Sequence, residues 1–347
     1  MNQHDLEDLG APCEEALDHF VYIIGMARGG TTVVRDALAV HDQILVLPDM
    51  THFMNQVWRY RRKVHQRLLN QIFRLPTFYH EEAVIQGLDD RKKKDLRRYI
   101  DTAMSSGDLK QMWQVYPLVY ALDRENCKKP ERIRCWADKA NDFFNVDAVA
   151  RHFPEGKFIF VVRDPKGAVA SLAKRAMVKE TRSHDAAPDI TKIVEACISW
   201  RRMTQQMLYF RKQYPQRTLL VKFEEFLSSP ARSLNEIFRF VLDEALEEPV
   251  LSERLSHVAY GASNVPTEGG KGIRKEPMER WKKSLGESHV KMVDRLTGKT
   301  ALRAGYETGS SEPLPGFGEI LKAFPTMKHK AVILAKLTYL EAFEALV

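Results

Sequence analysis

Short apolar runs alternate with longer amphipathic stretches along most of the chain. Five of the runs are rich in β-branched or aromatic residues, which predicts buried strands. They are Phe20–Ile24, Ile44–Leu47, Ile133–Trp136, Lys157–Val162 and Thr218–Phe223. Helical periodicity lies between them at Thr31–Val40, Pro165–Lys179 and Ile190–Tyr214, and it starts again near Pro230. Strands that alternate with helices predict a three-layer α/β fold with a central parallel sheet of about five strands.

The regular alternation is interrupted between residues 54 and 131, where the sequence is charged and helical. Within it, Trp58–Arg74 carries six Arg or Lys residues and no Asp or Glu. Such a run is typical of a solvated helix face, and it also fits a positively charged lid over an acceptor groove. We therefore expect a main domain over residues 18–306, with residues 54–131 as a helical basic insert on the acceptor side.

After Tyr306 the sequence ETGSSEPLPGFG is rich in turn residues, which is typical of a linker. The stretch from Phe324 to Val347 has helical apolar spacing, with lysines near its start. Residues 307–347 are therefore predicted to be a linker and a C-terminal helical extension. This helix could cap the domain, form a homodimer, or make peripheral contact with a membrane surface.

The composition is that of an ordinary globular protein, with 347 residues of which 44% are apolar and 29% charged. No run approaches the roughly 18 apolar residues of a membrane span, and the polar start MNQHDLEDLGAPCEE does not resemble a secretory signal. The four cysteines fit no zinc pattern, which favours reduced thiols in a cytoplasmic protein. The net charge of +7 suits anionic ligands, and no nucleic acid is expected as a partner.

The segment GMARGGTT, Gly25–Thr32, follows the first predicted strand and opens a helix. Its glycine spacing is that of an ATP-binding P-loop, but Thr31 occupies the lysine position and Arg28 is the nearby cation. Backbone N–H groups and the helix dipole at such a turn favour an anion. The missing lysine favours a single phosphate, and a guanidinium can bridge two oxyanions. A degenerate P-loop kinase or NTPase and a non-catalytic anion-binding protein are the alternatives.

The same loop, in MARGGTTVVRDALAVH, resembles the 5′-phosphosulfate loop of the sulfotransferases that use 3′-phosphoadenosine 5′-phosphosulfate (PAPS). The resemblance implies a P-loop-type fold and a nucleotide-binding transferase that requires no metal. It assigns Arg28 to the bridging and sulfuryl oxygens of the donor. It assigns the phosphate cradle to Gly29, Gly30, Thr31 and Thr32.

A second segment, KFIFVVRDPKGAVASLAKR, is similar to that family's 3′-phosphate loop. The similarity implies that Arg163 and Ser171 bind the 3′-phosphate of the donor. Arg175 lies one helical turn beyond Ser171 on the same predicted face, and it matches a further basic contact in the tyrosylprotein branch.

Three further segments are similar to family motifs. CWADKAND puts Lys139 where the family stabilises the transferring sulfuryl group, although Asn141 replaces the usual proline. LLVKFEEFLSSP puts Phe223 near the adenosine, where it replaces a tyrosine and keeps only the stacking. GIRKEPMERWKKSL suggests Arg280 near the 3′-phosphate.

The base that takes the acceptor's proton is expected after the second strand, in LPDMTHFM. The register of the tyrosylprotein branch implies Asp49, whereas the ordinary pKa of His52 is better matched to neutral pH. Both residues are candidates. The expected reaction moves the sulfuryl group of PAPS to a hydroxyl or amine by in-line displacement and releases 3′-phosphoadenosine 5′-phosphate (PAP). A glycan, a lipid or another metabolite is the expected acceptor.

Overall fold

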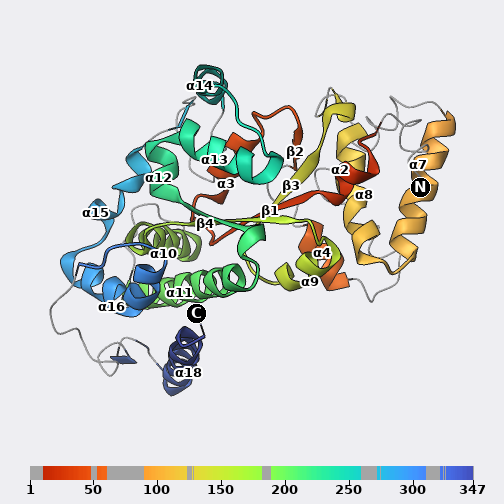
Figure 1. The fold of residues 1–347 in the computed structure, drawn as a ribbon. Coiled ribbons are helices and arrows are strands. Elements are labelled where there is room, and N and C mark those ends of the chain that lie inside the picture. The colour runs from red at the N-terminus through yellow and green to blue at the C-terminus, as the bar shows by residue number, and fades with distance from the viewer. Residues whose placement is uncertain are drawn as a thin grey trace. The chain divides into compact units, whose positions relative to one another are not determined.

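The computed structural model describes residues 11–47, 53–60, 90–122, 127, 129–181, 189–258, 272–273, 275–309, 321–322, 324 and 326–346. The predicted α/β fold is confirmed, because five parallel strands with flanking helices form one sheet in the order β2-β3-β1-β4-β5 (Figure 1). The strands are β1 (Phe20–Gly25), β2 (Ile44–Val46), β3 (Cys135–Ala140), β4 (Lys157–Val162) and β5 (Thr218–Lys222). All six residues of the central strand β1 are buried, as expected for a parallel strand covered on both faces.

Four strands match their predicted runs to within one residue, and β3 does not. The apolar run Ile133–Trp136 predicted its start, but the strand begins at Cys135 and continues through Asp138 and Lys139 to Ala140. Pairing with β2 sets the start of the strand, since Ile44 lies opposite Cys135 and the main-chain ladder does not depend on apolar side chains. The correction puts Asp138 and Lys139 inside the carboxyl end of a strand.

The described residues fall into two compact units. The first comprises Met1–Ile23, Thr32–Ile159 and Asn235–Lys271, and the second comprises Ile24–Thr31, Phe160–Leu234 and Gly272–Val347. Two helices, α3 (Thr31–Leu38) and α13 (Pro230–Leu242), contribute residues to both units.

The first unit contains β2, β3 and seven complete helices among its described residues. These helices are α2 (Glu14–Asp18), α4 (Phe53–Tyr60), α7 (Asp90–Ser105), α8 (Leu109–Leu122), η2 (Pro130–Arg132), α9 (Val146–His152) and α14 (Glu248–Ser256). The described parts of the predicted basic insert are therefore helical. They pack through α8, whose buried Trp113 donates from Nε1 to the carbonyl of Met54 at 3.1 Å. The lid function of this insert stays a prediction.

The second unit is built around α11, which packs along α10 and α16 (Figure 1). Its elements are α10 (Pro165–Thr181), α11 (Ile190–Gln213), η3 (Pro215–Arg217), β5, α12 (Phe223–Ser228), η4 (Glu276–Met278), α15 (Trp281–Ser284), α16 (Glu287–Arg303) and α18 (Met327–Glu344). Trp200, Met203 and Met207 on α11 line a small cavity together with Met26 and Gly29 of the loop that follows β1.

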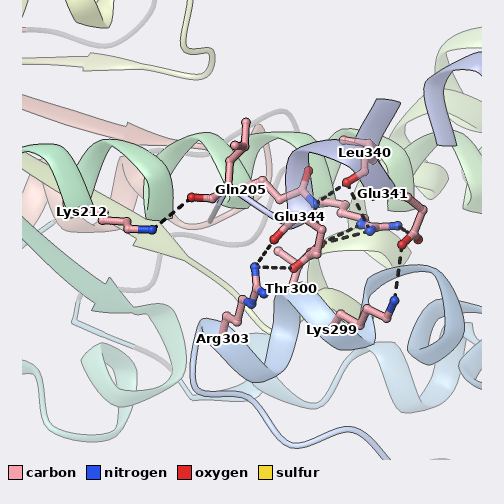
Figure 2. A network of polar contacts seen from close by, with 10 residues as sticks. Gln205, Lys212, Lys299, Thr300, Arg303, Leu340, Glu341 and Glu344 are labelled. Carbon is pink, nitrogen blue, oxygen red and sulfur yellow. Dashed lines mark hydrogen bonds and ion pairs between the residues drawn. The ribbon is translucent and has the colours of Figure 1, made fainter. Parts of the chain in front are cut away.

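The C-terminal helix α18 is bound to this unit through a buried carboxylate. Glu344 is 5% exposed and accepts hydrogen bonds from Thr300 at 2.7 Å and from Arg201 at 3.0 Å (Figure 2). Gln205 and Arg303 also donate to Glu344. The end of α18 is thus held by α11 and α16. The homodimer and the membrane contact proposed for this helix stay predictions.

Among the described residues, no helix has the length and apolarity needed to span a membrane. All four cysteines are free thiols, and three of them are buried.

Candidate functional site

The loop after β1 makes a tight and strained turn into α3. The amide of Gly29 donates to the carbonyl of Met26 at 2.8 Å, which closes the turn. Arg28 has a φ of 69° and Gly30 a φ of 99°, so both lie in the left-handed region. A left-handed residue other than glycine costs about 1–2 kcal/mol, and such strain is found mainly at functional sites. The strain marks this loop as a candidate functional site rather than a relaxed connection.

Phe223 packs directly on this loop. A methyl group at Gly30 would overlap the ring of Phe223. Glycine is therefore required here both by this close contact and by the positive φ of the backbone. Phe223 is the first residue of α12 and is 3% exposed. Its ring also lies 4.8 Å from the guanidinium carbon of Arg163, at cation–π distance. The ring thus contacts both the loop and Arg163. Its stacking on adenosine stays a prediction.

Arg163 follows β4, the neighbour of β1 in the sheet, and is 8% exposed. Its Nη1 donates to the carbonyl of Arg28 at 3.1 Å, and its Nη2 donates to the carbonyl of Pro277 at 2.6 Å. Its buried Nε has no hydrogen-bond partner among the described residues. A methyl group at Gly167 would lie 2.9 Å from this Nε, so the absence of a side chain there gives the guanidinium its room.

The two loops predicted to bind the two ends of one donor meet in the second unit. Arg28 donates from Nε to the hydroxyl of Ser171 on α10 at 2.9 Å. Burial lowers the pKa of Arg28, and the positive charges of Arg175 and Arg280 lower it further. Arg175 and Arg280 are both exposed, so their charges reach solvent at the edge of this cluster.

Four guanidinium groups are therefore grouped here, on Arg28, Arg163, Arg175 and Arg280. Burial also lowers the pKa of Arg163; the carboxylate of Glu224 opposes that effect, and Arg28 and Arg280 add to it. Like charges gathered at one place destabilise a folded protein unless an anion neutralises them. The arrangement suits a ligand that carries several negative charges.

Three side chains that the sequence analysis missed hold the backbone around Arg163. Glu224 accepts the amide of Asp164 at 3.1 Å, and Trp200 donates to the carbonyl of Arg163 at 2.9 Å. The hydroxyl of Tyr306 lies 2.9 Å from the carbonyl of Val162 and 2.8 Å from Oε2 of Glu224. Glu224 stands beside Phe223 in a recognised motif and could have been found there, whereas no local pattern marks Trp200 or Tyr306.

In the first unit, the structure brings Lys139 and Thr32 together. Nζ of Lys139, on β3, donates to the hydroxyl of Thr32, on α3, at 3.0 Å. Thr32 is half-buried, whereas Thr31 is 3% exposed. Both proposed bases, Asp49 and His52, lie outside the described residues, so their roles stay predictions. No group of three or more His, Cys, Asp or Glu side chains that could hold a metal ion is found among the described residues.

Comparison with known proteins places these features in context. A family model described as "Sulfotransferase family" matches residues 21–245. A curated relative, a putative protein-tyrosine sulfotransferase of Caenorhabditis elegans, is 21% identical over 176 residues, or 48% of this chain. The match spans 63% of that relative's length.

Two solved structures share the fold at low sequence identity. The sulfotransferase domain of the Synechococcus PCC 7002 olefin synthase has a TM-score of 0.50 and 18% identity, over 86% of this chain and 97% of that one. The sulfotransferase domain from the curacin biosynthetic pathway has a TM-score of 0.51 and 19% identity, over 84% of this chain and 99% of that one. At this level of identity the likeness concerns the fold.

Proposed function

Because the chain belongs to the sulfotransferase family, we propose that it moves the sulfuryl group of PAPS to a hydroxyl or amine of an acceptor. PAPS as the donor rests on the resemblance of two loops to the family's donor-binding motifs and on the arginines that these loops bring together. PAPS carries a 5′-phosphosulfate and a 3′-phosphate, and the chain offers arginines from two loops that match these two ends. PAP is the expected product.

The cluster of four arginines is the observation that carries this proposal. Arg28 belongs to the loop after β1, Arg163 follows β4, and Ser171 and Arg175 belong to α10. The hydrogen bond from Arg28 to Ser171 shows that the two loops reach each other. A donor with anionic groups at both ends would bring negative charge to this cluster of cations.

The proposed reaction is a direct displacement at sulfur. The acceptor oxygen or nitrogen attacks the sulfur atom, the bond from sulfur to the 5′-phosphate oxygen breaks, and PAP leaves with the electron pair. Arg28 and Lys139 stabilise the negative charge on the sulfuryl and bridging oxygens. Asp49 or His52 takes the acceptor's proton, which contributes roughly 10²–10⁴-fold to the rate. No step in this scheme calls for a metal ion.

A glycan, a lipid or another small metabolite is the proposed acceptor class. The basic sequence of the insert favours an acidic or glycan-like molecule among these. A cytoplasmic location is part of the same proposal, since all four cysteines are free thiols.

Calorimetric titration of the purified protein with PAP in the absence of Mg²⁺ tests the donor. We expect saturable binding of PAP, and much weaker binding of ATP with Mg²⁺. A response to ATP with Mg²⁺ and none to PAP would overturn the proposal in favour of a degenerate kinase or NTPase. Incubation with labelled PAPS and fractionated cell extract, followed by mass spectrometry, then identifies the acceptor.

A further inference from the structure

We propose that Glu224 and Tyr306 are positioning residues that fix the backbone on both sides of Arg163 and thereby give the site its selectivity for a 3′-phosphate. The inference rests on the proposed use of PAPS as donor. It concerns residues whose side chains hold the main chain around Arg163 and are not themselves proposed to touch the donor.

The backbone around Arg163 is held by side chains at three consecutive residues. The carbonyl of Val162 lies within reach of Tyr306, the carbonyl of Arg163 is bound by Trp200, and the amide of Asp164 is bound by Glu224. These groups come from positions 144, 37 and 60 residues away along the chain. Main-chain groups just past a strand end normally bond to water or to local turns, so their capture by distant side chains indicates a backbone held in one place.

The side chain of Arg163 depends on this placement. Its two terminal nitrogens bind the carbonyls of Arg28 and Pro277, and its charged face lies on Phe223. A planar guanidinium with fixed partners on three sides cannot compensate for a shifted backbone by choosing another rotamer. A small displacement of the main chain would therefore move the donors away from an anion, and misplacement by about 1 Å can cost roughly 10²-fold in an active site.

Tyr306 can be hydrogen-bonded to Glu224 and to the carbonyl of Val162 at the same time if Glu224 is protonated. A tyrosine hydroxyl has a single proton, yet two acceptor oxygens lie within 2.9 Å of Tyr306. A protonated Glu224 would donate to Tyr306, which would then donate to Val162. Burial raises the pKa of Glu224, while its bonds to Tyr306 and Asp164 and the charge of Arg163 act in the opposite direction.

This arrangement makes glutamine the informative replacement for Glu224. The amide oxygen of glutamine can accept the Asp164 N–H, and the amide nitrogen can donate to Tyr306 as the protonated acid does. Alanine can do neither. Glu224→Gln should therefore keep the backbone in place, whereas Glu224→Ala should release it.

The test compares the binding of PAP with the binding of AMP, which lacks the 3′-phosphate, in the full-length protein. We expect Tyr306→Phe and Glu224→Ala to weaken PAP by about tenfold or more, and to change AMP by less than about twofold. Glu224→Gln should bind PAP almost as the wild type does. Tyr209→Phe, at a hydroxyl-bearing residue 39% exposed on α11, is the matched control and should change neither ligand.

The possible outcomes separate this inference from the proposed donor. A wild-type protein that binds AMP as tightly as PAP would overturn the PAPS proposal itself. If the wild type prefers PAP but Tyr306→Phe weakens both nucleotides equally, or neither, the positioning role is wrong. A loss of PAP binding in Glu224→Gln as large as in Glu224→Ala would also contradict it, since the charge of Glu224 would then matter rather than its hydrogen bonds. Thermal unfolding of each variant confirms that the fold is retained.

Discussion

At Gly30, both the backbone angle and the packing of the loop after β1 require a glycine. Its φ of 99° disfavours any side chain, and the ring of Phe223 occupies the place that a side chain would need. The resemblance to the 5′-phosphosulfate loop assigned Gly30 to the phosphate cradle, and that role stays a prediction. In the structure the close approach at this position comes from Phe223, which links the loop to α12.

Gly30→Ala tests this double requirement, with Gly107→Ala as the control. Gly107 also has a positive φ, of 76°, but nothing lies within 4 Å of a methyl group placed there. We expect Gly107→Ala to lower the free energy of unfolding by about 1 kcal/mol and Gly30→Ala by about 2–4 kcal/mol, because overlap with the ring adds to backbone strain. Urea unfolding measures both, and equal losses would show that the contact with Phe223 contributes nothing.

At the scale of elements, α10 presents its site residues along one face. Ser171 and Arg175 are four residues apart, so they lie one above the other on the helix. Ser171 is bound to Arg28, and the charge of Arg175 lowers the pKa of the same Arg28. The helix therefore carries two of the residues proposed to bind the 3′-phosphate, and its start at Pro165 was already evident from the sequence.

Arg175→Ala should weaken PAP binding by about tenfold at low salt, because a positive charge close to the donor is removed. Lys174→Ala is the matched control, since Lys174 is the adjacent exposed cation and points about 100° away around the helix. It should change the affinity by less than about twofold. Calorimetry at low and high salt measures both variants, and equal losses would mean that only the general positive field attracts the ligand.

At the scale of the whole molecule, the chain ends in a helix whose last buried residue is ionic. Glu344 binds Arg201, Gln205 and Thr300, which come from α11 and α16 (Figure 2). The sequence analysis treated residues 307–347 as an extension after a linker. The contacts of Glu344 bind its described helix to the elements that also carry Trp200, a neighbour of Arg163.

Glu344→Ala should lower the free energy of unfolding by about 3 kcal/mol, because Arg201 would remain buried at 4% exposure without its inner carboxylate. Glu341→Ala provides the control, since Glu341 also pairs with Arg201 but its side chain is 42% exposed. That change should cost about 1 kcal/mol or less. Chemical unfolding followed by circular dichroism compares them. Similar losses would show that burial of the pair has no energetic consequence.

The sequence by itself determined most element starts and the glycine-rich character of the loop after β1. The periods of apolar residues that mark β1, β4, α10 and α11 are local, and so are the glycines, threonines and arginine of the loop after β1. Such signals depend on neighbours a few residues away.

Only the tertiary structure decided how far β3 extends and what holds Arg163. The start of β3 depends on its hydrogen-bonded register with β2, which an apolar run does not encode. Glu224, Trp200 and Tyr306 act on the backbone of Arg163 from separate elements, and Glu344 acts on residues about 140 positions away. Contacts of this kind are set by how helices and strands pack, so no pattern in the neighbouring sequence reveals them.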